Sequence, residues 1–158
     1  MTTLVSKIAY VDDSASMRRF GQVVLGGRGH DVVPFASGDE ALSAVGAGGF
    51  DLVISDVQMR GMDGVELCRR LRERFDKRRL PIVLVSVLEA EDDILRGFDA
   101  GASDWLVKPL RPALLQSKVK ILLGSAARDA DAPEPARPER VGDELPCRFD
   151  KYVMEEEL

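Results

Sequence analysis

Acidic side chains stand at the ends of two strand-like stretches of the sequence. Asp12 and Asp13 follow the apolar run that begins at Lys7, and Asp56 ends the apolar run that begins at Asp51. In a doubly wound parallel sheet, the carboxyl ends of neighbouring central strands meet at one crevice, so we expect the three carboxylates to converge there. Close carboxylates repel one another and raise one pKa, and a hard divalent cation neutralises them. Their all-oxygen donor set favours Mg²⁺.

A hydroxyl and an ammonium group are predicted to reach the same crevice. Ser86 lies at the end of the fourth apolar run, and Lys108 closes the fifth, directly before Pro109. Pro109 restricts Lys108 to extended backbone and admits a cis peptide bond. A lysine, a hydroxyl and a metal around a carboxylate complement a phosphoryl group, whose transfer depends on positioning and charge compensation. The pattern therefore indicates phosphoryl chemistry.

Five apolar runs of strand length alternate with longer amphipathic stretches up to residue 123. This alternation is typical of repeated strand–helix–strand units around a parallel sheet. The third and fourth runs are almost entirely apolar, as expected for central strands covered on both faces. The expected strands are 7–12, 31–36, 51–56, 81–87 and 104–108. We therefore predict an α/β fold with a doubly wound parallel sheet.

Helical signals fill the gaps between the strands. Ser37 and Glu40 have the spacing of a capping box, and Asp63 is expected to cap the third helix. The fourth helix is expected over residues 90–100. The fifth is expected to begin near Pro112, a residue suited to a first helical turn. Both of these last helices are expected to be short.

The composition changes after residue 123. Alanine, proline and charged residues dominate 124–145, which we interpret as an acidic linker. Residues 1–123 carry 17 basic and 17 acidic side chains, whereas 124–158 carry 5 and 10. The last stretch, 146–158, has apolar residues at helical spacing. It could dock on the first domain, begin a truncated output region, or have no fixed structure.

Composition argues against several classes of protein. The two cysteines, Cys68 and Cys147, lack the spacing of a zinc site, and the single histidine, His30, is distant from both in the sequence. A neutral body with an acidic extension offers no footprint for nucleic acid or an anionic membrane. The sequence has no apolar run of 18 residues and no secretory start. We expect a soluble, cytoplasmic protein.

Taken together in order, the site residues resemble those of the receiver family of response regulators, the phosphoryl-accepting half of two-component signalling. The resemblance rests on Asp12-Asp13, Asp56, Ser86, Trp105 and Lys108-Pro109. Asp56 lies 43 residues after Asp13, Ser86 lies 30 residues after Asp56, and Lys108 lies 22 residues after Ser86. The resemblance covers residues 4–123. It implies a flavodoxin-like, five-stranded sheet in the order 2-1-3-4-5, flanked by five helices, as in chemotaxis regulators. Arg60 departs from the family pattern, in which a proline is usual.

The resemblance also implies roles in phosphorylation. Asp56 would accept a phosphoryl group from the phosphohistidine of a sensor histidine kinase or a phosphotransfer protein. Mg²⁺ would be held by Asp13, Asp56 and the backbone carbonyl of Gln58, with Asp12 acting through water. Lys108 would pair with the carboxylate and then with the phosphoryl oxygens. The chain would assist its own phosphorylation and dephosphorylation without being an enzyme.

The switching roles follow from the same resemblance. Ser86 would move toward the phosphoryl group and Trp105 would follow, which would change the face formed by the fourth helix, fifth strand and fifth helix. That face could bind a downstream effector protein, a missing output domain or a second copy of the chain as a homodimer. No nucleic acid or membrane partner is expected for this chain.

Three alternative functions compete with the receiver. A magnesium-dependent phosphatase resembling haloacid dehalogenases would need an Asp-x-Asp motif after the first strand, and the run here is Asp12-Asp13-Ser14. A flavin-binding module would place a phosphate where two carboxylates would repel it. A passive docking module of receiver fold remains as an alternative, although every site position holds a competent residue.

Overall fold

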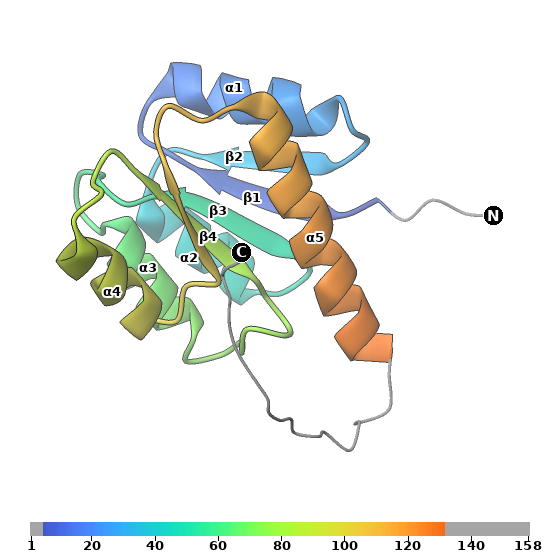
Figure 1. The fold of residues 1–158 in the computed structure, drawn as a ribbon. Coiled ribbons are helices and arrows are strands. Elements are labelled where there is room, and N and C mark those ends of the chain that lie inside the picture. Colours follow the sequence, from blue (N-terminus) through green and yellow to red (C-terminus); the bar gives the residue numbers. More distant parts are fainter. Residues whose placement is uncertain (1–4, 132–158) are drawn as a thin grey trace. The chain divides into compact units, whose positions relative to one another are not determined.

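The computed structural model describes residues 5–131, with side chains described as far as Gly124. Five parallel strands form one sheet in the order β2-β1-β3-β4-β5 (Figure 1). This confirms the predicted fold class and strand order, and each predicted strand lies within one residue of its observed limits. The strands are β1 (Lys7–Val11), β2 (Asp31–Phe35), β3 (Leu52–Asp56), β4 (Ile82–Ser86) and β5 (Asp104–Val107).

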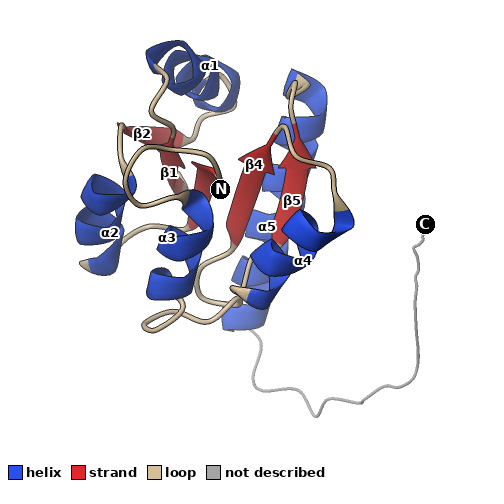
Figure 2. Cartoon of the chain, turned by 90° about the vertical axis from the view of Figure 1, so that its left-hand side faces the viewer, coloured by secondary structure: helices blue, strands red, loops and turns tan. Residues whose placement is uncertain are grey.

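Helices cover both faces of the sheet. In Figures 1 and 2, α1 and α5 lie on one side, and α2, α3 and α4 lie on the other. The helices are α1 (Ala15–Gly26), α2 (Gly38–Gly46), α3 (Gly64–Leu71), α4 (Glu91–Asp99) and α5 (Pro112–Asp131). The sheet belongs to a compact unit that extends to Ala127. Within residues 5–131, no helix combines the length and apolarity needed to cross a bilayer.

The alternation of side chains along β1 divides the core into two layers. Ile8 and Tyr10 pack with residues of α1 and α5, whereas Ala9 and Val11 pack with residues of α2, α3 and α4. Every residue of β3 and β4 is buried, as predicted for central strands covered on both faces. The edge strand β2 is more exposed and tolerates Pro34, because its outer side has no strand to pair with.

The predicted helix caps are present in the structure. The Glu40 amide donates to Ser37 Oγ at 3.2 Å, and Glu40 Oε1 accepts from the Ala36 amide at 3.1 Å. Asp63 Oδ1 accepts from the Glu66 amide at 2.8 Å at the start of α3. These side chains satisfy amides that have no partner within the helix, and they fix where α2 and α3 begin.

The last helix is longer than the sequence pattern predicted. We expected a short helix and a linker from residue 124, but α5 has 20 residues and ends at Asp131. The apolar periodicity fades near residue 123. The helix continues beyond that residue because Ala126, Ala127 and Arg128 have high helix propensity. The rest of the segment interpreted as a linker, 132–145, and the C-terminal stretch 146–158 lie outside the described residues.

Gly64 lets the start of α3 pack directly against the backbone that leaves β3. A β-carbon on Gly64 would collide with the carbonyl oxygen of Asp56 and would lie 2.9 Å from the Cα of Val57. The Gly64 amide also donates to the Val57 carbonyl at 2.9 Å. The absence of a side chain therefore brings the helix close to the strand end that carries Asp56.

We predict that Gly64→Ala destabilises the protein by about 2–3 kcal/mol, because backbone rather than a flexible side chain must move. Gly26→Ala is the matched control, since nothing lies within 4 Å of a β-carbon there and it sits in α1. That variant should be neutral or stabilising by up to about 1 kcal/mol. Urea unfolding measures both, and equal midpoints for the two variants would contradict the packing argument.

Candidate functional site

Three carboxylates converge at the carboxyl ends of β1 and β3, as the sequence predicted. Asp12 and Asp13 follow β1, and Asp56 is the last residue of β3. One oxygen from each lies within 4.8 Å of the others. Asp12 and Asp56 are buried, with exposures of 3% and 6%, whereas Asp13 is half-buried. The cluster is therefore open to incoming ions or ligands on the side of Asp13.

Lys108 brings a cation to this cluster from the adjacent end of the sheet. It follows β5, and its amide donates to the Ser86 carbonyl at 2.8 Å, which holds it beside the end of β4. Its Nζ lies 3.2 Å from Asp56 Oδ1 and 3.7 Å from Asp12 Oδ2. The Lys108-Pro109 peptide bond is cis. Lys108 thus compensates the charge of the two most buried carboxylates.

Burial raises the pKa of Asp56 above its usual range. The negative charge of Asp12 raises it further, and Asp13 adds a smaller effect in the same direction. Hydrogen bonding and charge attraction from Lys108 oppose these effects without cancelling them. The folded protein therefore destabilises the ionised form of Asp56 relative to the protonated form. A bound cation would stabilise the ionised form.

Two partly buried hydrogen bonds around Asp12 orient the acidic turn. Asp12 Oδ1 accepts from the Ser14 amide at 2.9 Å, and Arg18 donates from α1 to the Asp12 carbonyl at 2.7 Å. Sequence analysis did not assign a role to either contact. The Asp-x-Ser spacing at the start of a helix is a turn signal that could have indicated the first.

Ser86 and Trp105 are joined through the backbone of Leu88. Ser86 is fully buried at the end of β4, and its Oγ accepts from the Leu88 amide at 2.9 Å. The Trp105 indole Nε1 donates to the Leu88 carbonyl at 3.2 Å. Trp105 is 8% exposed, and its ring packs against Gly97 of α4. Ser86 is therefore connected to Trp105, and through its ring to α4, by the backbone of a single residue.

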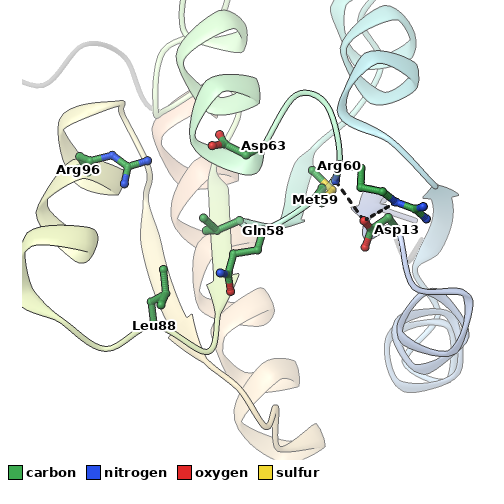
Figure 3. Close-up of a pocket in the computed structure, with 8 residues that line it drawn as sticks. Asp13, Gln58, Met59, Arg60, Asp63, Leu88 and Arg96 are labelled. Atoms are coloured by element: carbon green, nitrogen blue, oxygen red, sulfur yellow. Dashed lines mark hydrogen bonds and ion pairs between the residues drawn. The ribbon is translucent and has the colours of Figure 1, made fainter.

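A cavity of about 430 Å³ opens beside the carboxylates (Figure 3). Gln58, whose carbonyl was the predicted fourth oxygen donor, lies in its wall between β3 and α3. Two arginines that sequence analysis did not place at the site, Arg60 and Arg96, also line it. The complete lining is Asp13, Val57, Gln58, Met59, Arg60, Asp63, Leu88 and Arg96.

The residues present fit a hard divalent cation. Three carboxylates supply oxygen atoms within 4.8 Å of one another, and neither sulfur nor imidazole belongs to the cluster. Oxygen-only donor sets suit Mg²⁺, which also keeps several water molecules and therefore needs an open side. The half-buried Asp13 and the adjacent cavity provide that side.

Comparisons with known proteins agree with the fold. Residues 8–120 match the family described as the response regulator receiver domain. The chain therefore belongs to the response regulator receiver family of two-component signalling. It is 35% identical over 123 residues to the transcriptional regulatory protein ResD of Bacillus subtilis. The aligned region covers 78% of this chain and 50% of ResD. The chain spans about half the length of the curated relatives it matches.

Solved structures show the same fold. The chemotaxis protein CheY4 of Vibrio cholerae superposes with a TM-score of 0.71 and 32% identity, covering 75% of this chain and 99% of that one. The receiver domain of Klebsiella pneumoniae RstA, activated with BeF3, gives a TM-score of 0.69 and 32% identity, covering 75% and 98%. Strand order and helix placement thus agree with receivers of similar size.

Proposed function

We propose that Asp56 is the phosphoacceptor of this receiver and that its phosphorylation by a histidine kinase or phosphotransfer protein depends on Mg²⁺. The observation that carries the proposal is the convergence of Asp12, Asp13 and Asp56 within 4.8 Å, with the Lys108 ammonium 3.2 Å from Asp56. A nucleophile, a counter-ion and an oxygen-only metal set are what phosphoryl transfer to a carboxylate needs.

The proposed reaction transfers one phosphoryl group between two nucleophiles. A carboxylate oxygen of Asp56 attacks the phosphorus of a phosphohistidine, the phosphorus–nitrogen bond breaks, and the imidazole nitrogen keeps the electron pair. The product is an aspartyl phosphate. Lys108 favours the ionised carboxylate that attacks, since it opposes the rise in the Asp56 pKa, and it then faces the phosphoryl oxygens.

Asp13, Asp56 and the Gln58 carbonyl would hold the cation, with Asp12 acting through a water molecule. Bound Mg²⁺ supplies positive charge to the phosphoryl oxygens and to the carboxylates. Asp12 contributes mainly through charge and orientation, because Ser14 and Lys108 already engage both of its carboxylate oxygens. The chain promotes its own modification by the phosphoryl donor and is itself the molecule that is modified.

We place the output of the switch on the face formed by α4, β5 and α5. Ser86 moving toward the phosphoryl group would break its bond to Leu88, and Leu88 holds the Trp105 indole. Exposed apolar side chains lie on all three elements and support contact with a partner, namely Leu95, Phe98, Val107 and Leu114. The occupant is a downstream protein, an output domain or a second copy of the chain.

Trp105 fluorescence should report the switch, because it is the only tryptophan in the chain. We predict that Mg²⁺ with beryllofluoride, a phosphoryl mimic, changes its emission as the bond to Leu88 rearranges. Asp56→Asn should remove the beryllofluoride response. An unchanged wild-type spectrum would contradict the proposed link from Asp56 to Trp105, and would favour the passive docking role.

The names of the relatives bear on the wider role of the protein. ResD is named a transcriptional regulatory protein, and the chain spans half of it. Regulation of transcription is therefore a proposal for the whole protein, not a property of residues 5–131. The division into a receiver domain and a C-terminal region, and the cytoplasmic location, also stay proposals.

A further inference from the structure

Arg60 makes two contacts with the half-buried carboxylate of the acidic cluster. Its backbone amide donates to Asp13 Oδ2 at 3.2 Å, and its guanidinium Nε lies 3.8 Å from the same oxygen (Figure 3). Arg60 belongs to the segment between β3 and α3, which also carries Gln58. The guanidinium therefore occupies the open side of the cluster, through which a metal ion would enter.

Two cations then share three carboxylates in the metal-free protein. Lys108 lies against Asp56 and Asp12, and Arg60 lies against Asp13. Their charges bring the cluster from −3 to −1 without any bound ion. A divalent cation that binds Asp13 must either displace the Arg60 guanidinium or bind next to its positive charge. Either event weakens the binding of the divalent cation.

The two contacts of Arg60 differ in how easily they are lost. The Arg60 side chain is 93% exposed, so its guanidinium has room to swing into solvent when a metal ion binds, at the cost of its contact with Asp13. The backbone amide is fixed by the segment and can stay on Asp13 Oδ2 when the guanidinium leaves. Arg60 can therefore release the charge contact without loss of the orientation that its amide gives to Asp13.

The geometry points to Arg60 as a built-in competitor of the metal ion, which raises the Mg²⁺ concentration at which the phosphoacceptor site fills. This inference rests on the proposed role of the cluster as the Mg²⁺ site. Its consequence is regulatory, since phosphorylation would respond to Mg²⁺ over a higher concentration range than the carboxylates alone would set.

Isothermal titration of Mg²⁺ into the full chain tests this inference. Arg60→Ala removes the guanidinium and keeps the backbone amide, and we expect it to bind Mg²⁺ about 3- to 10-fold more tightly at low salt. Arg60→Lys should stay within about 2-fold of wild type because it keeps the charge. The gain in Arg60→Ala should shrink at 0.5 M NaCl, where exposed charges are screened over about 4 Å.

Arg96→Ala is the matched control. Arg96 lines the same cavity, but its guanidinium lies 3.7 Å from Asp93 and makes no described contact with Asp13. We expect its affinity to stay within about 2-fold of wild type. Clear wild-type binding with no gain in Arg60→Ala, or an equal gain in Arg96→Ala, would overturn the inference alone. Absence of Mg²⁺ binding in every variant would overturn the proposed metal site as well.

Discussion

Asp56→Asn is expected to abolish phosphorylation and, at the same time, to make the metal-free protein more stable at neutral pH. Phosphorylation is lost because an amide cannot attack phosphorus as a carboxylate does. Stability rises because burial and the charge of Asp12 disfavour the ionised Asp56 in the folded state. Function and stability therefore conflict at this one position.

The pH dependence of this gain has a definite sign. The folded protein raises the pKa of Asp56, so between the unfolded and folded pKa values the folded state binds more protons, and wild-type stability falls as pH rises. The penalty is complete above the folded pKa and absent below the unfolded one. The advantage of Asp56→Asn should therefore be largest at neutral pH and should vanish in acid.

Urea unfolding in EDTA, repeated across pH, measures the effect. Asp63→Asn is the matched control: Asp63 lines the adjacent cavity but caps α3, and asparagine also serves as a helix cap. It should change stability by less than about 0.5 kcal/mol. A gain in Asp56→Asn that is independent of pH would contradict the electrostatic explanation. Saturating Mg²⁺ should narrow the difference, since it stabilises wild type by binding.

Lys108→Ala is expected to slow phosphorylation by acetyl phosphate about 100-fold at saturating Mg²⁺, a loss typical of removing one preorganised donor. Two effects act together. The variant lacks the ammonium 3.2 Å from Asp56, which opposes the rise in the pKa of that carboxyl. It also lacks the cation that faces the charge developing on the phosphoryl oxygens.

Lys118→Ala separates these local effects from a general loss of positive charge. Lys118 pairs with Asp104 at 3.0 Å and makes no described contact with the carboxylate cluster. The phosphorylation rate of this variant should stay within about 2-fold of the wild-type rate, because salt screens an exposed surface charge. Initial rates from intact mass measure both variants. A Lys108→Ala rate close to that of Lys118→Ala would remove Lys108 from the proposed mechanism.

The site residues that lie at strand ends could be predicted from the sequence. Asp12, Asp56 and Lys108 each stand at the end of an apolar run, and a parallel sheet brings such ends to one edge regardless of loop details. The order of the strands came from the resemblance to receivers, because the periodicity of the runs does not distinguish one order from another. The observed order confirms that resemblance.

Contacts made by loops and exposed side chains could not be predicted in this way. The position of Arg60 on Asp13 depends on the path of the segment between β3 and α3, for which hydrophobic periodicity carries no information. The shared attachment of Ser86 and Trp105 to Leu88 depends likewise on the path of the segment that follows β4. The observed α5 is longer than predicted because the loss of apolar spacing near residue 123 predicts a helix end, whereas helix-forming residues continue beyond it.

The most direct test of the account is intact mass measurement after incubation with acetyl phosphate and Mg²⁺. The account predicts one added phosphoryl group per wild-type chain, its loss when EDTA replaces Mg²⁺, and none in Asp56→Asn. Reduction of the aspartyl phosphate with borohydride, followed by peptide mapping, should place the modification at Asp56. An unmodified wild-type chain, or a phosphoryl group that persists in Asp56→Asn, would contradict it.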